Sequence, residues 1–185
     1  LNYAYETAIG ALCDETVPDA DSADRIVRAV SLLAKKAGIY GMVGGQCVDV
    51  DSEKTGSRLT RELLDYIYAN KTGALLEAAM GIGAILGGAS DEEYDTVIDI
   101  AGKIGLAFQI RDDILDTIGD EEILGKPIGS DERNEKATYV AFEGIEKSKA
   151  DVERLTALAV ELLHTLPGNG TFLEELLLSL VEREK

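Results

Sequence analysis

The sequence has few basic residues and no dense cluster of them. Its 185 residues include 18 Lys and Arg against 35 Asp and Glu, which gives a net charge of −17. Proteins that bind nucleic acids or anionic membrane surfaces electrostatically need grouped Lys and Arg side chains. The composition therefore argues against a nucleic-acid partner. It also means that a phosphorylated ligand would have to be held by a few individually placed cations and by metal ions.

Cysteine is also scarce, and long uninterrupted apolar runs are missing. Cys13 and Cys47 are far apart and both fall in helix-like segments, so we expect reduced thiols in the core of a cytoplasmic protein. The most apolar stretch, residues 72–89, contains Glu77 and is otherwise too short for a membrane span of about 20 residues. We interpret it as a buried helix in close contact with its neighbours.

Strand-like alternation of polar and apolar residues is absent, and almost every segment has helical periodicity. We therefore predict an all-α fold in a single domain, residues 1–185. The predicted helices cover residues 1–12, 23–50, 60–86, 91–118, 137–166 and 171–185. Ser90 and Glu93 are spaced as a capping box at the start of the helix 91–118. Residues 119–136, which contain Gly and Pro, are predicted to form a loop.

The most informative segment is residues 108–116, FQIRDDILD. On a helix, spacings of three and four residues return to the same face, which brings the polar side chains of this segment together. Asp112 and Asp116 stand one turn apart, and two carboxylates about 6 Å apart repel by about 3 kcal/mol at an effective dielectric near 20. Oxygen-only ligands favour a hard cation such as Mg²⁺, which binds one or two carboxylates and completes its shell with water and substrate phosphate. The alternative interpretation is a solvated acidic helix face.

Three further blocks accompany this segment in the chain. They are GGQCVD, with Gly44, Gly45, Gln46 and Asp49; KTGAL, with Lys71 and Thr72; and GKPIGSD, with Gly125, Lys126, Gly129 and Asp131. Together with FQIRDDILD and in this order, they resemble the trans-isoprenyl diphosphate synthases, the family that includes farnesyl and geranylgeranyl diphosphate synthases. The resemblance runs from end to end of the chain, which is identified on these motifs as a member of that family.

The resemblance implies an isoprenoid synthase-type helical bundle and a prenyltransferase. Such an enzyme ionises an allylic diphosphate with the help of Mg²⁺, adds the carbocation to isopentenyl diphosphate and then loses a proton. The implied product is a short-chain trans-prenyl diphosphate such as farnesyl or geranylgeranyl diphosphate. The implied partners are the two diphosphate substrates and a second copy of the chain in a homodimer. Mn²⁺ is an alternative to Mg²⁺ as the cofactor.

The resemblance also implies roles for individual residues. Its candidate metal ligands are Asp112, Asp113 and Asp116. Its candidate catalytic residues are Asp112, Lys71 and Lys126. Its candidate substrate-binding residues are Lys71, Thr72, Gln109, Lys126, Gln46 and Lys136. Asp49 and Asp131 are expected to contact a lysine or a metal-bound water, without touching the metal ion or the substrate themselves. Taken alone, Lys71 or Lys126 would more often be a solvated surface residue, and the order of the motifs favours the phosphate-binding role.

The family's first aspartate-rich motif and the upstream basic cluster that holds isopentenyl diphosphate are absent. DEEYD at residues 91–95 cannot replace that motif, because it lies on the predicted helix of Asp112, about 25 Å away along the axis. We therefore expect this chain to be the C-terminal part of a synthase, inactive by itself. The alternatives are a natural short subunit that has lost catalysis, a non-catalytic regulatory subunit of a heteromeric synthase, and a terpene cyclase-like enzyme. An acidic helical scaffold would explain none of the four blocks.

Overall fold

The computed structural model describes residues 2–13, 19–55, 59–118, 138–168 and 170–182. These residues are helical apart from short connections, and no strand occurs among them. The predicted all-α fold is therefore confirmed. The predicted loop at residues 119–136 lies outside the described residues.

The helices follow the predicted order, with additional breaks. The α-helices are α1 (Asn2–Gly10), α2 (Ala20–Ala37), α3 (Met42–Thr55), α4 (Arg61–Ile67), α5 (Ala74–Gly87), α6 (Asp91–Ile118), α9 (Tyr139–Glu143), α10 (Ile145–Leu163) and α11 (Thr171–Glu182). A 3-10 turn, Ala11–Cys13, follows α1, and a π-helical turn, Tyr68–Gly73, connects α4 to α5.

Side chains cap the starts of two helices, and the cap of α6 is the predicted one. Ser90 donates its backbone N–H to Glu93 over 2.7 Å, and Glu93 donates its N–H to the Ser90 hydroxyl over 3.3 Å. This reciprocal pair is the capping box of α6. At the start of α4, the Thr60 hydroxyl accepts a hydrogen bond from the backbone N–H of Leu63.

Three predicted helices are each divided in the structure. The predicted helix 60–86 becomes α4, the π turn and α5. The predicted helix 23–50 becomes α2 and α3, separated by a turn at residues 38–41. The predicted helix 137–166 becomes α9 and α10, because Gly144 between them has a φ of 80°. That left-handed conformation interrupts a right-handed helix, and glycine adopts it at little cost.

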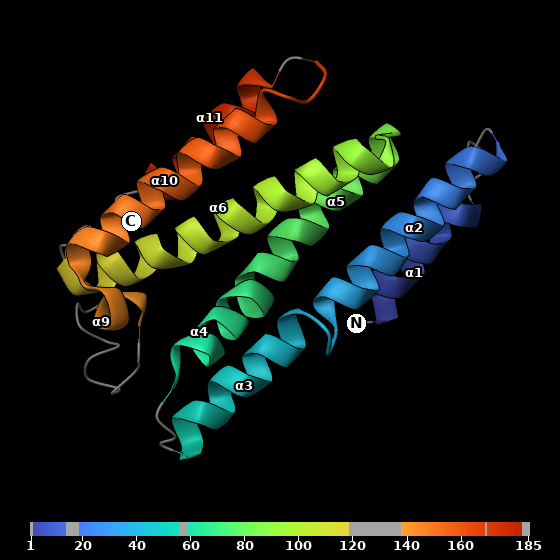
Figure 1. The fold of residues 1–185 in the computed structure, drawn as a ribbon. Helices are drawn as coiled ribbons and strands as arrows, with labels where there is room; N and C mark the ends of the chain where they lie inside the picture. Colours follow the sequence, from blue (N-terminus) through green and yellow to red (C-terminus); the bar gives the residue numbers. More distant parts are fainter. Residues whose placement is uncertain (1, 14–18, 56–58, 119–137, 169, 183–185) are drawn as a thin grey trace.

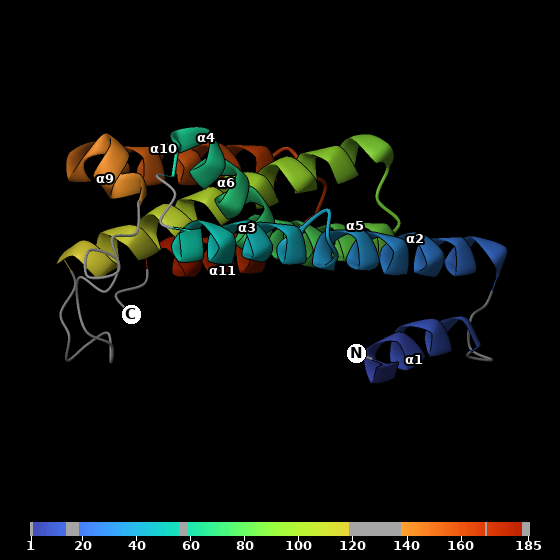
Figure 2. The same ribbon diagram turned by 90° about the horizontal axis from the view of Figure 1, so that it is seen from below.

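The helices pack as neighbouring rods (Figure 1). α2 and α3 run end to end along one side, and α4, the π turn and α5 form a second rod beside them. α6 follows α5, and α10 packs along α6. Figure 2 shows that α10 and α11 lie at different levels, and both contact α6. In the same view α1 stands apart from the layer formed by α2, α3 and α5.

Two clusters of buried apolar side chains hold these helices together, and α6 contributes to both. Ile110 and Ile114 pack with residues of α4, α9, α10 and α11. Ile100 and Ile104 pack with residues of α10 and α11. Burying one such side chain contributes about 1.5–3 kcal/mol. α6 is therefore the central helix, and its buried isoleucines determine which way its polar residues point.

Close backbone packing brings α3 and α6 against the π turn. A Cβ atom on Gly45 of α3 would overlap the backbone nitrogen of Lys71 and would lie 2.9 Å from the Cβ of Asn70. A Cβ on Gly105 of α6 would lie 3.1 Å from the Cα of Gly73. Backbone atoms cannot move aside as the end of a flexible side chain can, so larger residues at these two positions would displace the turn.

We predict opposite effects for two glycine substitutions in the chain 1–185. Gly45→Ala should lower the free energy of unfolding by about 1–3 kcal/mol, because the methyl group meets the backbone of the π turn. Gly83→Ala is the matched control: Gly83 lies within α5 with nothing within 4 Å of its hypothetical Cβ. It should raise the free energy of unfolding by about 0.5–1 kcal/mol through helix propensity. Urea denaturation measures both, and equal stability of the two variants would contradict the close packing.

Candidate active site

The π-helical turn is the structural feature around which the motif residues gather. It spans Tyr68–Gly73 and therefore contains Lys71 and Thr72 of the KTGAL block. π-helical turns are rare and occur often at functional sites, because the wider turn redirects the side chains it carries. The sequence predicts a continuous α-helix here, and no residue pattern signals the wider turn.

Lys71 is paired with the GGQCVD block. Its Nζ donates to Oδ2 of Asp49 over 2.5 Å. The Asp49 side chain is 3% exposed and that of Lys71 is 32% exposed. One charge is therefore buried while the other still reaches the surface. This geometry orients the Lys71 ammonium group and leaves it accessible to solvent. Contact with a lysine is also one of the two roles expected for Asp49. Gln46 lies one turn earlier on α3 and is partly exposed.

Thr72 connects the π turn to the aspartate-rich helix. Its hydroxyl donates to Oε1 of Gln109 over 3.1 Å. The bond uses the amide oxygen of Gln109 as acceptor, and the N–H donors of the amide take no part in it. Three of the four sequence blocks thus meet through two direct side-chain contacts, Asp49 with Lys71 and Thr72 with Gln109.

The three aspartates of the FQIRDDILD segment, all on α6, have different surroundings. Asp112 is partly buried, whereas Asp113 and Asp116 are 7% and 4% exposed. Oδ2 of Asp113 accepts hydrogen bonds from the Tyr68 hydroxyl and from the backbone N–H of Tyr139, the latter over 2.6 Å. Asp113 is therefore held by protein donors, which its sequence context did not predict. Among the described residues, no group of three or more His, Cys, Asp or Glu side chains is arranged to hold a metal ion.

Tyr139 is itself held by surrounding charges. Its hydroxyl donates to Oδ2 of Asp151 over 2.9 Å, and the Arg61 guanidinium lies 4.2 Å from the centre of its ring. Burial raises the pKa of the Tyr139 hydroxyl, so the group remains a protonated donor near neutral pH. Arg61 also pairs with Glu143 and with Asp65. Sequence reasoning missed Tyr68, Tyr139 and Arg61, because only the fold brings them next to α6.

Some predicted residues lie elsewhere. Lys126, Asp131 and Lys136 are outside the described residues, so their contribution to the site stays a prediction. The expectation that Cys47 is a core thiol is wrong: Cys47 is a free, exposed residue of α3. It lies on the solvent side of the helix that buries Asp49, which periodicity alone did not reveal.

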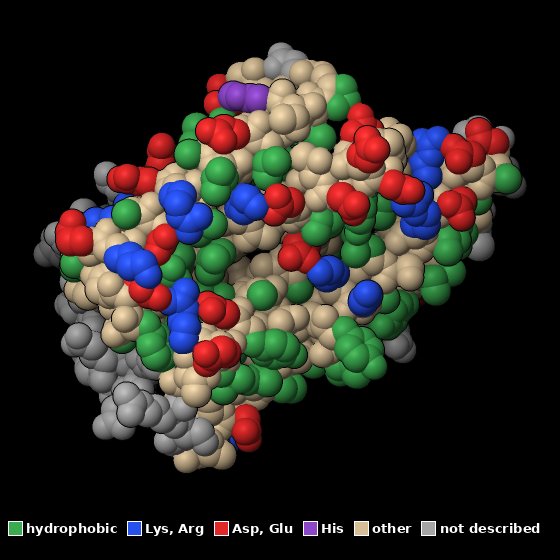
Figure 3. Space-filling view, viewed as in Figure 1, with side chains coloured by type: hydrophobic (Ala, Val, Ile, Leu, Met, Phe, Trp, Pro, Cys, Tyr) green, Lys and Arg blue, Asp and Glu red, His purple; other side chains and the backbone are tan. Residues whose placement is uncertain are grey.

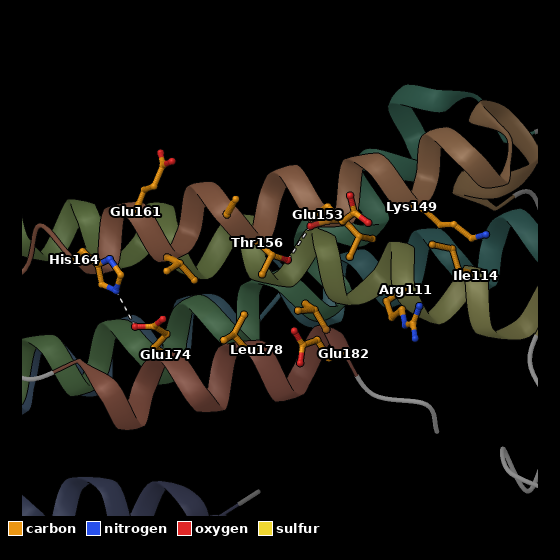
Figure 4. A pocket seen from close by; sticks show the side chains of 14 residues that line it. Arg111, Ile114, Lys149, Glu153, Thr156, Glu161, His164, Glu174, Leu178 and Glu182 are labelled. Atoms are coloured by element: carbon orange, nitrogen blue, oxygen red, sulfur yellow. Dashed lines mark hydrogen bonds and ion pairs between the residues drawn. The ribbon is translucent and has the colours of Figure 1, made fainter.

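A separate groove of about 840 Å³ lies between α6, α10 and α11. Figure 4 shows Arg111 and Lys149 toward one end, and His164 with Glu174 toward the other. His164 and Glu174 are 2.8 Å apart and connect α10 to α11. The lining includes none of the π-turn residues and none of the three aspartates. We therefore place the candidate site at the π turn, on a different face of α6 from this groove.

The outer surface mixes charges and exposed apolar side chains. Figure 3 shows acidic and basic side chains interspersed over one face, with hydrophobic side chains gathered toward the side of α2 and α3. Ile39 and Tyr40, in the turn between these helices, are 67% and 75% exposed, and Val43 of α3 is 41% exposed. In the described part of the chain, no helix combines the length and the apolarity needed to cross a membrane.

Similar proteins are about twice as long as the segment that matches this chain. Geranylgeranyl diphosphate synthase from Cyanophora paradoxa is 45% identical over 161 residues, which cover 87% of this chain and 51% of the relative. Farnesyl diphosphate synthase from Geobacillus stearothermophilus is 43% identical over 149 residues, covering 80% of this chain and 48% of the relative. The chain thus spans about half the length of these relatives.

Solved structures agree with this relationship. A geranyltransferase from Helicobacter pylori, complexed with magnesium and isoprenyl diphosphate, is 28% identical with a TM-score of 0.73; the match covers 98% of this chain and 56% of that one. An FPP/GFPP synthase from Zymomonas mobilis is 28% identical with a TM-score of 0.76, covering 92% and 55%. The predicted isoprenoid synthase-type fold is therefore confirmed. The polyprenyl synthetase family model matches residues 4–164, and the chain belongs to the polyprenyl synthetase family.

Proposed function

We propose that this chain forms one wall of the active site of a trans-prenyltransferase, which joins an allylic diphosphate to isopentenyl diphosphate. The observation that carries the proposal is the meeting of three motif blocks at the π turn, through the contacts of Lys71 with Asp49 and of Thr72 with Gln109. The names of the relatives support this reaction class. They also support a short-chain product such as farnesyl or geranylgeranyl diphosphate.

The donors on α6 fit a magnesium ion shared with a diphosphate. Asp112 and Asp116 offer carboxylate oxygens one helical turn apart, and Mg²⁺ needs only one or two protein carboxylates when phosphate and water supply the rest. The Helicobacter pylori relative was solved with magnesium and an isoprenyl diphosphate, which supports the same cofactor here. When bound, Mg²⁺ would neutralise the charge that develops on a leaving diphosphate.

The chain's own residues would bind and orient the allylic diphosphate. Lys71, held by Asp49, would place a compact positive charge next to the diphosphate, where metal ions leave little room for a larger group. Thr72 and Gln109 add a hydroxyl and an amide as hydrogen-bonding groups. Because these groups are held in place before the substrate arrives, they need not reorganise as charge builds on the diphosphate. Lys126 and Lys136 would contribute further cations, with Asp131 in support and Gln46 facing the allylic substrate.

We infer that the protein acts in the cytoplasm as a homodimer. The exposed side chains of Ile39, Tyr40 and Val43 support a self-association surface on the side of α2 and α3. Replacing Ile39 by Lys should weaken self-association, which sedimentation velocity at several protein concentrations measures. An unchanged association state would place the interface elsewhere.

The activity is tested by transplanting this chain into a complete synthase. In the Geobacillus stearothermophilus relative, the matching segment of this chain replaces its counterpart, and the hybrid is incubated with Mg²⁺, isopentenyl diphosphate and allylic diphosphates of several lengths. The unmodified relative is the control. Prenyl transfer by the hybrid supports the proposal, whereas a folded but inactive hybrid contradicts it.

Asp112→Ala in the active hybrid should reduce turnover about 100- to 1,000-fold, because one group that stabilises the developing diphosphate charge is lost. The folded state should not lose stability, since removing one of two neighbouring carboxylates relieves their repulsion. Asp95→Ala is the matched control, an exposed aspartate on the same helix. Steady-state kinetics and thermal denaturation provide the two measurements. A large loss of stability with Asp112→Ala would instead make Asp112 structural.

Lys71→Ala should act on the allylic substrate alone. It removes a charge-assisted contact of about 1.5–3 kcal/mol, equivalent to roughly a 10- to 150-fold change in an equilibrium constant. The Michaelis constant for the allylic diphosphate should rise and turnover should fall, while the constant for isopentenyl diphosphate stays within about twofold. Lys35→Ala, an exposed lysine on α2, is the control. A change confined to the isopentenyl diphosphate constant would move Lys71 to the other half of the site.

A further inference from the structure

Tyr68 links the π turn directly to the aspartate-rich helix. It is the first residue of the turn and is 7% exposed, and its hydroxyl donates to Oδ2 of Asp113. Lys71 and Thr72 lie three and four residues further along the same turn. One turn of backbone therefore carries two candidate phosphate-binding side chains and a donor to the helix of the candidate metal ligands.

The same oxygen of Asp113 is held from a second direction. The backbone N–H of Tyr139, at the start of α9, donates to Oδ2 over 2.6 Å. Tyr139 cannot easily shift, because its ring lies under Arg61 and its hydroxyl is bound to Asp151. Hydrogen bonds to an ionised carboxylate are about twice as strong as bonds between neutral groups. Asp113 is therefore an anchored side chain between the π turn and α9.

Anchoring Asp113 determines the rotation of the last turns of α6. Asp112 precedes it and Asp116 follows three residues later, so the three side chains belong to one rigid stretch of helix. If α6 rotated or shifted there, the Asp113 carboxylate would leave both of its donors. The directions of Asp112 and Asp116 relative to Lys71 and Thr72 thus depend on the contact between Tyr68 and Asp113.

We propose that Tyr68 is a positioning residue that acts through Asp113, and that Asp113 anchors α6 instead of binding the metal. A metal ion on Oδ2 would have to displace the two hydrogens that already point at this oxygen. The inference rests on the proposed function only in assigning the metal and diphosphate to Asp112 and Asp116. The anchoring itself depends on contacts within this chain.

The first test follows the anchor by NMR in the full chain 1–185. Tyr68→Phe removes only the hydroxyl and keeps the ring, which borders a cavity of about 310 Å³ behind the turn. We expect faster hydrogen exchange at the Tyr139 amide and changed carboxyl carbon shifts for Asp112 and Asp116. Tyr66→Phe, at an exposed tyrosine of α4, is the matched control and should change neither. Exchange and shifts equal to those of the wild type would overturn the proposal.

The second test separates positioning from metal binding on the same chain. Amide shifts are followed as Mg²⁺ and inorganic pyrophosphate are added to wild type, Tyr68→Phe, Asp113→Asn and the double variant. Mutating a residue that supports a metal ligand typically lowers metal affinity about 10- to 100-fold. Each single variant should therefore bind Mg²⁺ and pyrophosphate about tenfold more weakly. If Tyr68 acts through Asp113, the double variant should be no worse than either single variant.

Each remaining outcome is decisive. The proposal would be overturned if the losses of binding affinity caused by the two substitutions multiplied in the double variant. It would also be overturned if Asp113→Asn lost far more affinity than Tyr68→Phe, because Asp113 would then be a metal ligand. If Tyr68→Phe fails to fold, hydrogen exchange at the Tyr139 amide is measured in Asp113→Asn instead, which keeps the rings of Tyr68 and Tyr139. A wild-type chain that does not bind Mg²⁺ and pyrophosphate would count against the proposed function, while the Tyr139 exchange data would still decide the anchoring.

Discussion

Close packing of three backbones at the π turn is the constraint on which the rest of the site depends. Gly45 brings α3 onto the backbone of Lys71, and Gly105 brings α6 onto Gly73. At this spacing the short contacts of Asp49 with Lys71 and of Thr72 with Gln109 become geometrically accessible. Because protein interiors are close-packed, a displacement at either glycine would be transmitted to both contacts.

The electrostatics of the site follow from the same packing. A chain with a net charge of −17 repels phosphate on average. Binding of a diphosphate therefore requires local cations whose positions are fixed. Lys71 meets this requirement because Asp49, on a neighbouring helix, holds it from the buried side. The carboxylates of α6 would then contribute through a shared metal ion, which reverses the sign of their effect on phosphate.

The anchoring of α6 adds a second layer to this arrangement. Arg61 lies against Tyr139, Tyr139 binds Asp113, and Asp113 also accepts a bond from Tyr68 at the start of the π turn. α4, α6 and α9 are thereby connected through polar groups that are largely removed from water. Such networks are stabilising only when their members are satisfied, and they then favour one arrangement of the helices.

The sequence by itself determined the all-α class, the extent of α6 and its capping box, and the family, because helical periodicity and motif order are local properties of the chain. It also predicted that the polar side chains of FQIRDDILD share one face of the helix, since residues three and four apart on a helix are neighbours. The tertiary structure alone decided the break at Gly144, the π turn, the exposure of Cys47 and the different roles open to Asp113. These features depend on contacts between residues such as Tyr68 and Asp113, which are 45 positions apart. Local spacing carries no information on which helix faces will meet, because that choice is made by the packing of the whole core.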